Sequence, residues 1–220
     1  LSDAERPRLV VYDTASWAVA FDLRGSKAVF GSLSWRPDSR LLACGNRVGV
    51  LHLLDVQTGA VERIAGPRQL PLTALDWHPE GDRLAVCSSG HAVRVFEVGS
   101  SRWRRLGNHR HRVAACAWSH DGSLLATTGW DATARVWDER RAKAWRTVRP
   151  AGAPIARVAR LQFRRDGMLV GDSGRDTRVF DPKTGALVER IDGVDTTWNR
   201  DLRLVAYRRG AEVLVRRTGG

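Results

Sequence analysis

HRHRVAACAWSHDGSLLATTGWDATARVWD, residues 109–138, is the stretch on which most of the chain is patterned. Two apolar runs, at 113–119 and 123–128, are separated by a His-Asp-Gly turn, and a third run at 133–137 follows a Gly-Trp-Asp-Ala turn. Short runs rich in β-forming residues and bounded by Gly and Asp are typical of antiparallel strands joined by hairpins. The stretch therefore predicts three consecutive strands of one sheet.

The same pattern recurs along the chain at two markers that stay in step. An aromatic residue followed by a turn ends each expected first strand, about 35 to 45 residues after the previous one, at Trp35, Trp77, Trp118, Phe163 and Trp198. A second marker ends each expected third strand, in the segments that begin at Leu53, Val95, Val136 and Val179. A period of about 40 to 45 residues with four strands per unit is typical of β-propellers. We therefore expect an all-β propeller of four-stranded antiparallel blades, with about five repeat units, in which the repeated Trp residues pack inside or between blades.

The stretch from His109 to Asp138 also resembles a WD repeat. It has a His before the first strand, an aromatic at the end of that strand, an Asp-Gly turn, and Asp131 six residues before the Trp137-Asp138 pair. The resemblance to the WD-repeat β-propeller family covers nearly the whole chain and is most specific in this unit. It implies that the visible units could belong to a seven-bladed ring, which is usual in that family.

The chain is expected to be a single WD-repeat β-propeller domain or segment over residues 1–220. Its units are a partial blade at 1–26, four full blades at 27–66, 67–107, 108–150 and 151–192, and a partial blade at 193–220. Either Trp17–Leu23 completes the last blade and closes a ring of five, or both ends continue into a larger ring. Because the chain starts at Leu1 and its only methionine is Met168, we expect a monomeric domain within a larger or processed protein.

The resemblance also implies a hydrogen-bonded structural tetrad in the third full unit, formed by His109, Thr127, Asp131 and Trp137. Each hydrogen bond stabilises by only about 0.5–1.5 kcal/mol, but an unpaired buried polar group costs about 1–3 kcal/mol, so such a set favours one packing. The first two units have other residues at the Asp131 and Trp137 positions, namely Val48 and Leu54, and Gly90 and Phe96. These units are expected to rely on apolar packing.

The net charge of +12 comes almost entirely from arginine, with dense clusters at 102–112 and 140–149. Two interpretations remain open: a solvated face of the outer strands, or a surface that binds nucleic acid or another polyanion.

The three cysteines, Cys44, Cys87 and Cys116, fall inside expected strands, and their spacing matches no metal-binding pattern. This favours buried thiols and a cytoplasmic location. No apolar run reaches the 18 to 20 or so residues that span a bilayer, so no membrane role is expected.

No catalytic motif is visible, so we expect no enzyme activity, no cofactor and no metal site. The carboxylates that follow the expected third strands, Asp55, Glu97, Asp138 and Asp181, are explained by turn formation.

The expected function is a scaffold whose rim loops bind a protein or peptide, with polyanion binding as the alternative. Exposed Trp and Arg are the commonest interface anchors. The partner-binding candidates are Trp130, Arg110, Arg112, Arg47, Ser89 and Arg175. For Trp130, packing over its own hairpin is the competing interpretation.

Overall fold

The computed structural model describes residues 9–23, 29–138, 144–148, 160–198 and 204–217. Within these ranges the chain forms 21 β-strands and no helix. The strands pair only with their neighbours in the sequence, always antiparallel, and the described part of the chain consists of six small sheets. The all-β prediction, with four-stranded antiparallel units, is confirmed.

Four of the sheets have four strands, and we number them blades 1 to 4. Blade 1 contains β3 (Phe30–Trp35), β4 (Leu41–Asn46), β5 (Val50–Asp55) and β6 (Val61–Ala65), and blade 2 contains β7 (Leu72–Trp77), β8 (Arg83–Ser88), β9 (Ala92–Glu97) and β10 (Arg102–Asn108). Blade 3 contains β11 (Val113–Trp118), β12 (Leu124–Gly129), β13 (Ala134–Asp138) and β14 (Ala144–Val148). Blade 4 contains β15 (Arg160–Phe163), β16 (Leu169–Asp172), β17 (Thr177–Phe180) and β18 (Leu187–Ile191).

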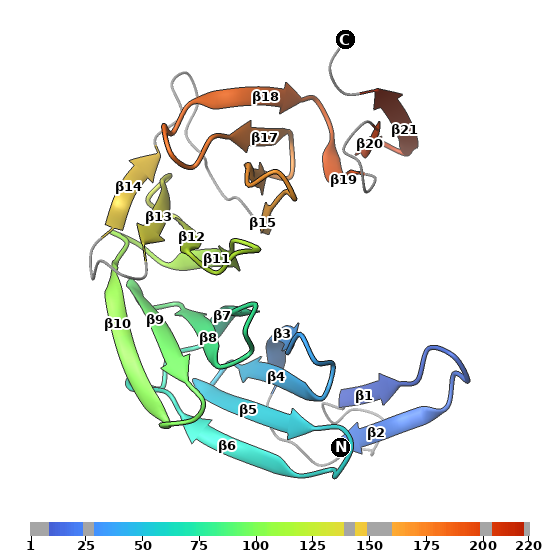
Figure 1. Cartoon of the computed structure of the whole chain (residues 1–220), viewed down its shortest axis with the longest axis vertical. Coiled ribbons are helices and arrows are strands. Elements are labelled where there is room, and N and C mark those ends of the chain that lie inside the picture. Colours follow the sequence, from blue (N-terminus) through green and yellow to red (C-terminus); the bar gives the residue numbers. More distant parts are fainter. Residues whose placement is uncertain (1–8, 24–28, 139–143, 149–159, 199–203, 218–220) are drawn as a thin grey trace.

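The two remaining sheets flank these blades in the sequence. The first pairs β1 (Leu9–Tyr12) with β2 (Val19–Leu23), and the last contains β19 (Val194–Trp198), β20 (Leu204–Arg209) and β21 (Glu212–Arg217). The proposed closure of five blades by Trp17–Leu23 is wrong, because β2 pairs with β1 and not with the last sheet. The described strands form an open arc, and the sheets at its two ends lie apart (Figure 1).

The first strand of each blade lies on the concave side of the arc and the fourth on the convex side (Figure 1). Because the blades share one strand order and every pair is antiparallel, the second-to-third hairpins and the links between blades lie at the same ends of the strands. We call this side of the arc the binding rim. The first-to-second and third-to-fourth hairpins lie on the opposite rim. The binding rim therefore carries all six of the predicted partner-binding residues.

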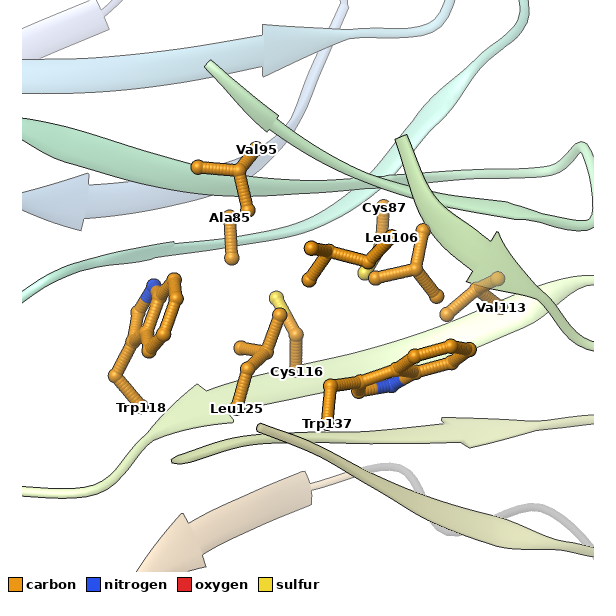
Figure 2. Packing of buried hydrophobic residues seen from close by; sticks show 10 residues of the cluster. Ala85, Cys87, Val95, Leu106, Val113, Cys116, Trp118, Leu125 and Trp137 are labelled. Atoms are coloured by element: carbon orange, nitrogen blue, oxygen red, sulfur yellow. The ribbon is translucent and has the colours of Figure 1, made fainter. Parts of the chain in front are cut away.

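The hydrophobic core lies between successive blades. Figure 2 shows the cluster between blades 2 and 3, in which Ala85, Cys87, Val95 and Leu106 face Val113, Cys116, Trp118, Leu125 and Trp137. Gly107 on β10 makes this approach possible, because a Cβ at that position would collide with the Trp137 ring. The three cysteines are free and buried, as expected. Burial of these side chains supplies most of the stabilising free energy that fixes one blade against the next.

The repeated Trp residues do not all fit the expectation of a packed position. Trp77 and Trp118 are buried against the preceding blade: the Trp77 indole donates to the Ser34 carbonyl at 3.0 Å, and the Trp118 ring packs edge-on against His78. Trp35, in contrast, is 44% exposed, and for this residue the prediction was wrong. Among the described residues, the sheet before blade 1 contains the two strands β1 and β2 and no inner strand that would cover Trp35. The side chains of Trp145 and Trp198 lie outside the described residues.

Candidate rim-loop interface

Blade 3 contains a buried polar network at the binding rim. His109, from the link before β11, places its Nδ1 3.0 Å from Asp131 Oδ1 and its Nε2 2.8 Å from Thr127 Oγ1. The Trp137 indole donates to the same Thr127 oxygen at 2.8 Å. Asp131 also accepts hydrogen bonds from the backbone N–H of Arg110 at 2.7 Å and from the Thr133 hydroxyl at 2.7 Å. The structure therefore joins the four residues of the predicted tetrad, and adds Thr133, which the sequence interpretation missed.

The pKa shifts and the burial of Asp131 and His109 indicate that this network holds the fold together. Burial raises the pKa of Asp131, but the hydrogen bonds from Arg110, Thr133 and His109 outweigh burial and lower that pKa to about 2. Burial lowers the pKa of His109 despite the neighbouring carboxylate. The imidazole is 3% exposed, so neither ring nitrogen is available to an outside substrate. The pair ties the link before blade 3 to the β12–β13 hairpin.

Blades 1 and 2 hold the corresponding hairpins differently. In blade 1, the Asn46 side-chain oxygen accepts hydrogen bonds from the backbone N–H groups of Val48 and Val50, at 3.0 and 2.8 Å. The residues at the Trp137 position, Leu54 and Phe96, are fully buried in apolar surroundings. Apolar packing thus takes the place of the tetrad in both blades, and blade 1 adds a local Asn turn.

An exposed stack of rings lies on the binding rim of blades 2 and 3. His91, on the β8–β9 hairpin, is nearly parallel to His111 with ring centroids 6.2 Å apart, and His111 is nearly parallel to Trp130 at 5.9 Å. The Arg112 guanidinium lies over the Trp130 ring, 5.0 Å from its centroid. His111 and Arg112 both come from the link between β10 and β11, and Trp130 remains 47% exposed, so the ring is held in place and still presents part of its surface to solvent. We call His91, His111, Arg112 and Trp130 the rim stack.

The structure brings together only some of the predicted partner-binding residues. Arg112 and Trp130 are in contact, and the exposed Arg110 lies in the same loop as Arg112. Arg47 and Arg175 are exposed on the hairpins of blades 1 and 4, and within the described part of the chain they share no hydrogen bond, ion pair or ring contact with the rim stack. The sequence interpretation did not single out His91 and His111. Their position beside Trp130 depends on the packing of two blades, which no local pattern reveals.

Ser89 belongs to a neighbouring basic pocket rather than to the rim stack. This pocket, of about 410 Å³, is lined by Ser89, Gly90, Arg68, Arg94 and Arg105, among others, and His91 belongs to both the pocket lining and the rim stack. The sequence interpretation placed Arg105 in a basic cluster but did not recognise Arg68 or Arg94. The signal that could have found them is the register of the β9–β10 hairpin, which places Arg94 directly opposite Arg105.

Two further places have side chains that could carry chemistry. The concave side of the arc borders a cavity of about 650 Å³, whose lining includes small residues of the inner strands, such as Thr73, Ala114 and Ala115, and also the charged Arg160, Asp172 and Asp195. His78, Glu80 and Asp82 could together supply metal ligands. However, the His78 Nε2 atom lies 3.1 Å from both the Gly122 carbonyl and the Arg83 guanidinium, and a cation at that distance opposes metal binding. Within the described residues, no helix is long and apolar enough to cross a membrane.

Comparisons with known proteins agree with this architecture. Residues 62–97 and 101–138 match the family model described as "WD domain, G-beta repeat". Coronin-7 of Rattus norvegicus is 34% identical over 78 residues, which are 35% of this chain and 8% of that protein. The COMPASS component SWD3 of Saccharomyces cerevisiae is 22% identical over 180 residues, which are 80% of this chain and 55% of that protein.

A solved structure shares the fold over most of the chain. A chain in the crystal structure of the mitotic checkpoint complex superposes with a TM-score of 0.81 at 22% identity, covering 94% of this chain and 67% of its own length. The present chain therefore spans less than a tenth of the coronin-7 relative and about half of the SWD3 relative. Residues 62–97 and 101–138 are therefore WD repeats, and with its four-stranded blades and this structural likeness the chain has the fold of a WD-repeat β-propeller.

Proposed function

We propose that the chain is a non-catalytic scaffold whose binding rim at blades 2 and 3 receives a protein or peptide partner. The observation that carries this proposal is the rim stack, in which an exposed Trp130 is held by contacts with His111 and Arg112. Trp and Arg are the residues most often found as interface hot spots. A ring that is already held in place loses little conformational freedom on binding, so more of the contact energy remains as affinity.

The family supports the same class of function. WD-repeat propellers are generally protein-interaction scaffolds, and the similar proteins include a component of one assembly and a chain from the structure of another. The three free, buried cysteines fit a reducing compartment, and we therefore propose a cytoplasmic location. Binding of nucleic acid through the arginine surface is the competing outcome of the experiment below.

The experiment compares two triple variants that remove the same residue types from opposite rims. The rim variant carries Trp130→Ala, Arg110→Ala and Arg112→Ala. The control carries Trp17→Ala, Arg102→Ala and Arg165→Ala, which removes an exposed Trp and two exposed Arg at the opposite rim. The two variants have the same net charge, so a difference between them reports on position and not on charge.

Each purified protein is used to capture partners from a native lysate at moderate salt, with and without nuclease, after thermal denaturation has shown that it folds. We expect protein partners that survive nuclease treatment to bind the wild type and the control but not the rim variant. Equal capture by both variants would reject this rim. Capture that disappears with nuclease, or that falls steeply with salt, would replace the scaffold proposal with nucleic-acid binding.

A further inference from the structure

The basic pocket is best understood by comparing one position in three blades. The third strands of blades 2, 3 and 4 each have an arginine two residues before a Phe or Trp near the end of the strand. These arginines are Arg94, Arg135 and Arg178. The three side chains point to the same face of their sheets because they occupy the same place in the alternation of each strand. Their electrostatic partners differ from blade to blade.

Blade 4 neutralises its arginines internally. Arg178 lies directly opposite Arg190 of β18 in the strand register. The Asp176 carboxylate lies between them, with the same oxygen 3.0 Å from Arg178 Nε and 2.8 Å from Arg190 Nε. The carboxylate is buried and also accepts a hydrogen bond from the Ser173 hydroxyl at 2.6 Å. One buried acid thus holds two facing arginines in place.

Blade 3 also supplies an acid, from a different position in the hairpin. Arg135 lies 3.8 Å from the Asp131 carboxylate, which stands four residues before it, whereas Asp176 of blade 4 stands two residues before Arg178. The outer strand places Thr147, not an arginine, opposite Arg135. Both hairpins therefore balance the charge of this arginine from within the blade.

Blade 2 has the facing arginines but neither acid. Arg94 lies directly opposite Arg105, and the residues four and two positions before Arg94 are Gly90 and Ala92. Arg68, from the link between blades 1 and 2, lines the same pocket as a third cation. Within the described residues, neither Arg68 nor Arg94 forms an ion pair with an acidic side chain.

Without a bound anion, the repulsion between these arginines destabilises the fold. Like charges directly opposite in a sheet are destabilising, and Arg94 is half-buried. Burial, and then the positive charges of Arg68 and Arg105, lower the pKa of Arg94. The space that the carboxylate occupies in the other blades remains open here, as part of the pocket of about 410 Å³ whose lining includes Gly90 and Ala92. The pocket thus has the cations of an ion-pair site, the half-buried Arg94 and the exposed Arg68 and Arg105, without its anion.

We propose that this pocket binds a phosphate group, which takes the place of the carboxylate missing from blade 2. A single carboxylate serves two arginines in blade 4, whereas three arginines converge here and match the charge of close to −2 that a phosphate monoester carries. Guanidinium groups also suit phosphate oxygens because they form two parallel hydrogen bonds to them. This inference goes beyond the scaffold proposal, because phosphate can be tested without any protein partner.

The most informative variant restores the internal acid. Ala92→Asp places a carboxylate where blade 4 has Asp176, and Ser89 stands three residues before it, as Ser173 does in blade 4. We expect this variant to melt at a higher temperature than the wild type in chloride and to lose the response to phosphate. Arg94→Gln should lose the response without the gain in melting temperature. Arg102→Gln, on the same strand β10 as Arg105 but outside the pocket, is the control.

Melting temperatures are measured for the purified chain in chloride, acetate and inorganic phosphate at one ionic strength and neutral pH, and phosphate affinity is measured by calorimetric titration. Saturable stabilisation by phosphate, with an affinity about tenfold or more weaker in Arg94→Gln and unchanged in Arg102→Gln, would support the site. A second titration with O-phosphoserine distinguishes an esterified group from free phosphate.

Two results would overturn the inference. One is equal stabilisation of the wild type by chloride, acetate and phosphate. The other is a phosphate response that persists in both Ala92→Asp and Arg94→Gln. Because Arg94→Gln removes a repelled charge and leaves the core intact, it remains a valid test even if Ala92→Asp fails to fold.

Discussion

Blades 2 and 4 face the same electrostatic problem and differ in how it is solved. Each places two arginines opposite one another on its third and fourth strands, Arg94 with Arg105 and Arg178 with Arg190. Blade 4 supplies the buried Asp176 as a shared partner, whereas blade 2 leaves an open pocket with a third arginine beside it. The difference teaches that a repeated position can serve folding in one blade and remain available for binding in another.

Blade 3 extends the comparison to carboxylates. Asp131 of blade 3 is stabilised by several hydrogen-bond donors, while the half-buried Asp76 of blade 2 accepts one hydrogen bond, from the Trp118 backbone N–H at 2.6 Å. Consequently the pKa of Asp131 is lowered to about 2, whereas partial burial raises the pKa of Asp76 to about 6. Ionised Asp131 thus stabilises blade 3, and ionised Asp76 destabilises blade 2.

Removing the charge of Asp131 should have the largest effect on stability. Asp131→Asn replaces an acceptor of hydrogen bonds from Arg110, Thr133 and His109 with a group that must donate as well as accept. We expect a loss of about 2–4 kcal/mol in the free energy of unfolding, measured by urea denaturation. Asp192→Asn, at a carboxylate whose side chain is 75% exposed, should change stability by less than about 0.5 kcal/mol. A loss for Asp131→Asn no larger than that of this control would show that the network does not hold blade 3.

The contributions of Asp131 and Asp76 to stability should change with pH in opposite directions. Asp131, whose pKa is lowered from 3.8 to about 2, stabilises the fold above pH 4, and this contribution is lost as the pH falls toward 2. The pKa of Asp76 is raised from 3.8 to about 6, so its favourable contribution is present below pH 4 and is lost as the pH rises through 6.

The measurement is the difference in unfolding free energy between the wild type and each Asp→Asn variant across this pH range. We expect the wild type to lose about 2–3 kcal/mol relative to Asp76→Asn between pH 4 and pH 7. For Asp131→Asn, the advantage of the wild type should shrink below pH 4. A difference for Asp76→Asn that does not vary with pH would mean that Asp76 is ionised in the fold without cost.

Much of the fold could be predicted from the sequence, because each strand and hairpin is encoded locally and repeated. The alternation of apolar residues, the Asp-Gly turns and the recurring Trp define strands such as β11 and β12 within a residue of their observed bounds. The tetrad could also be predicted, because its residues follow from the resemblance of one unit to the WD-repeat family. Exposure was harder to predict: Trp35 shares a repeated position with Trp77, and only the absence of a covering inner strand separates them.

The candidate site was only partly predictable, because it depends on contacts between loops and strands that are distant in the sequence. Trp130 and Arg112 could be chosen as rim residues from the sequence, but their stacking with His111 and His91 could not be predicted. The basic pocket required the exact pairing of Arg94 with Arg105, and a shift of one residue in that hairpin would have placed them on opposite faces.

The most direct test of the unequal roles of these arginines compares Arg178→Gln with Arg94→Gln by urea denaturation in chloride. Arg178→Gln removes one of the two arginines bound to the buried Asp176, so we expect a loss of about 1–3 kcal/mol in the free energy of unfolding. Arg94→Gln removes a cation that faces Arg105 and Arg68 and has no acidic partner among the described residues, so stability should stay unchanged or rise by about 0.5 kcal/mol. A loss in Arg94→Gln as large as that in Arg178→Gln would contradict the account, because it would mean that blade 2 uses this arginine to fold.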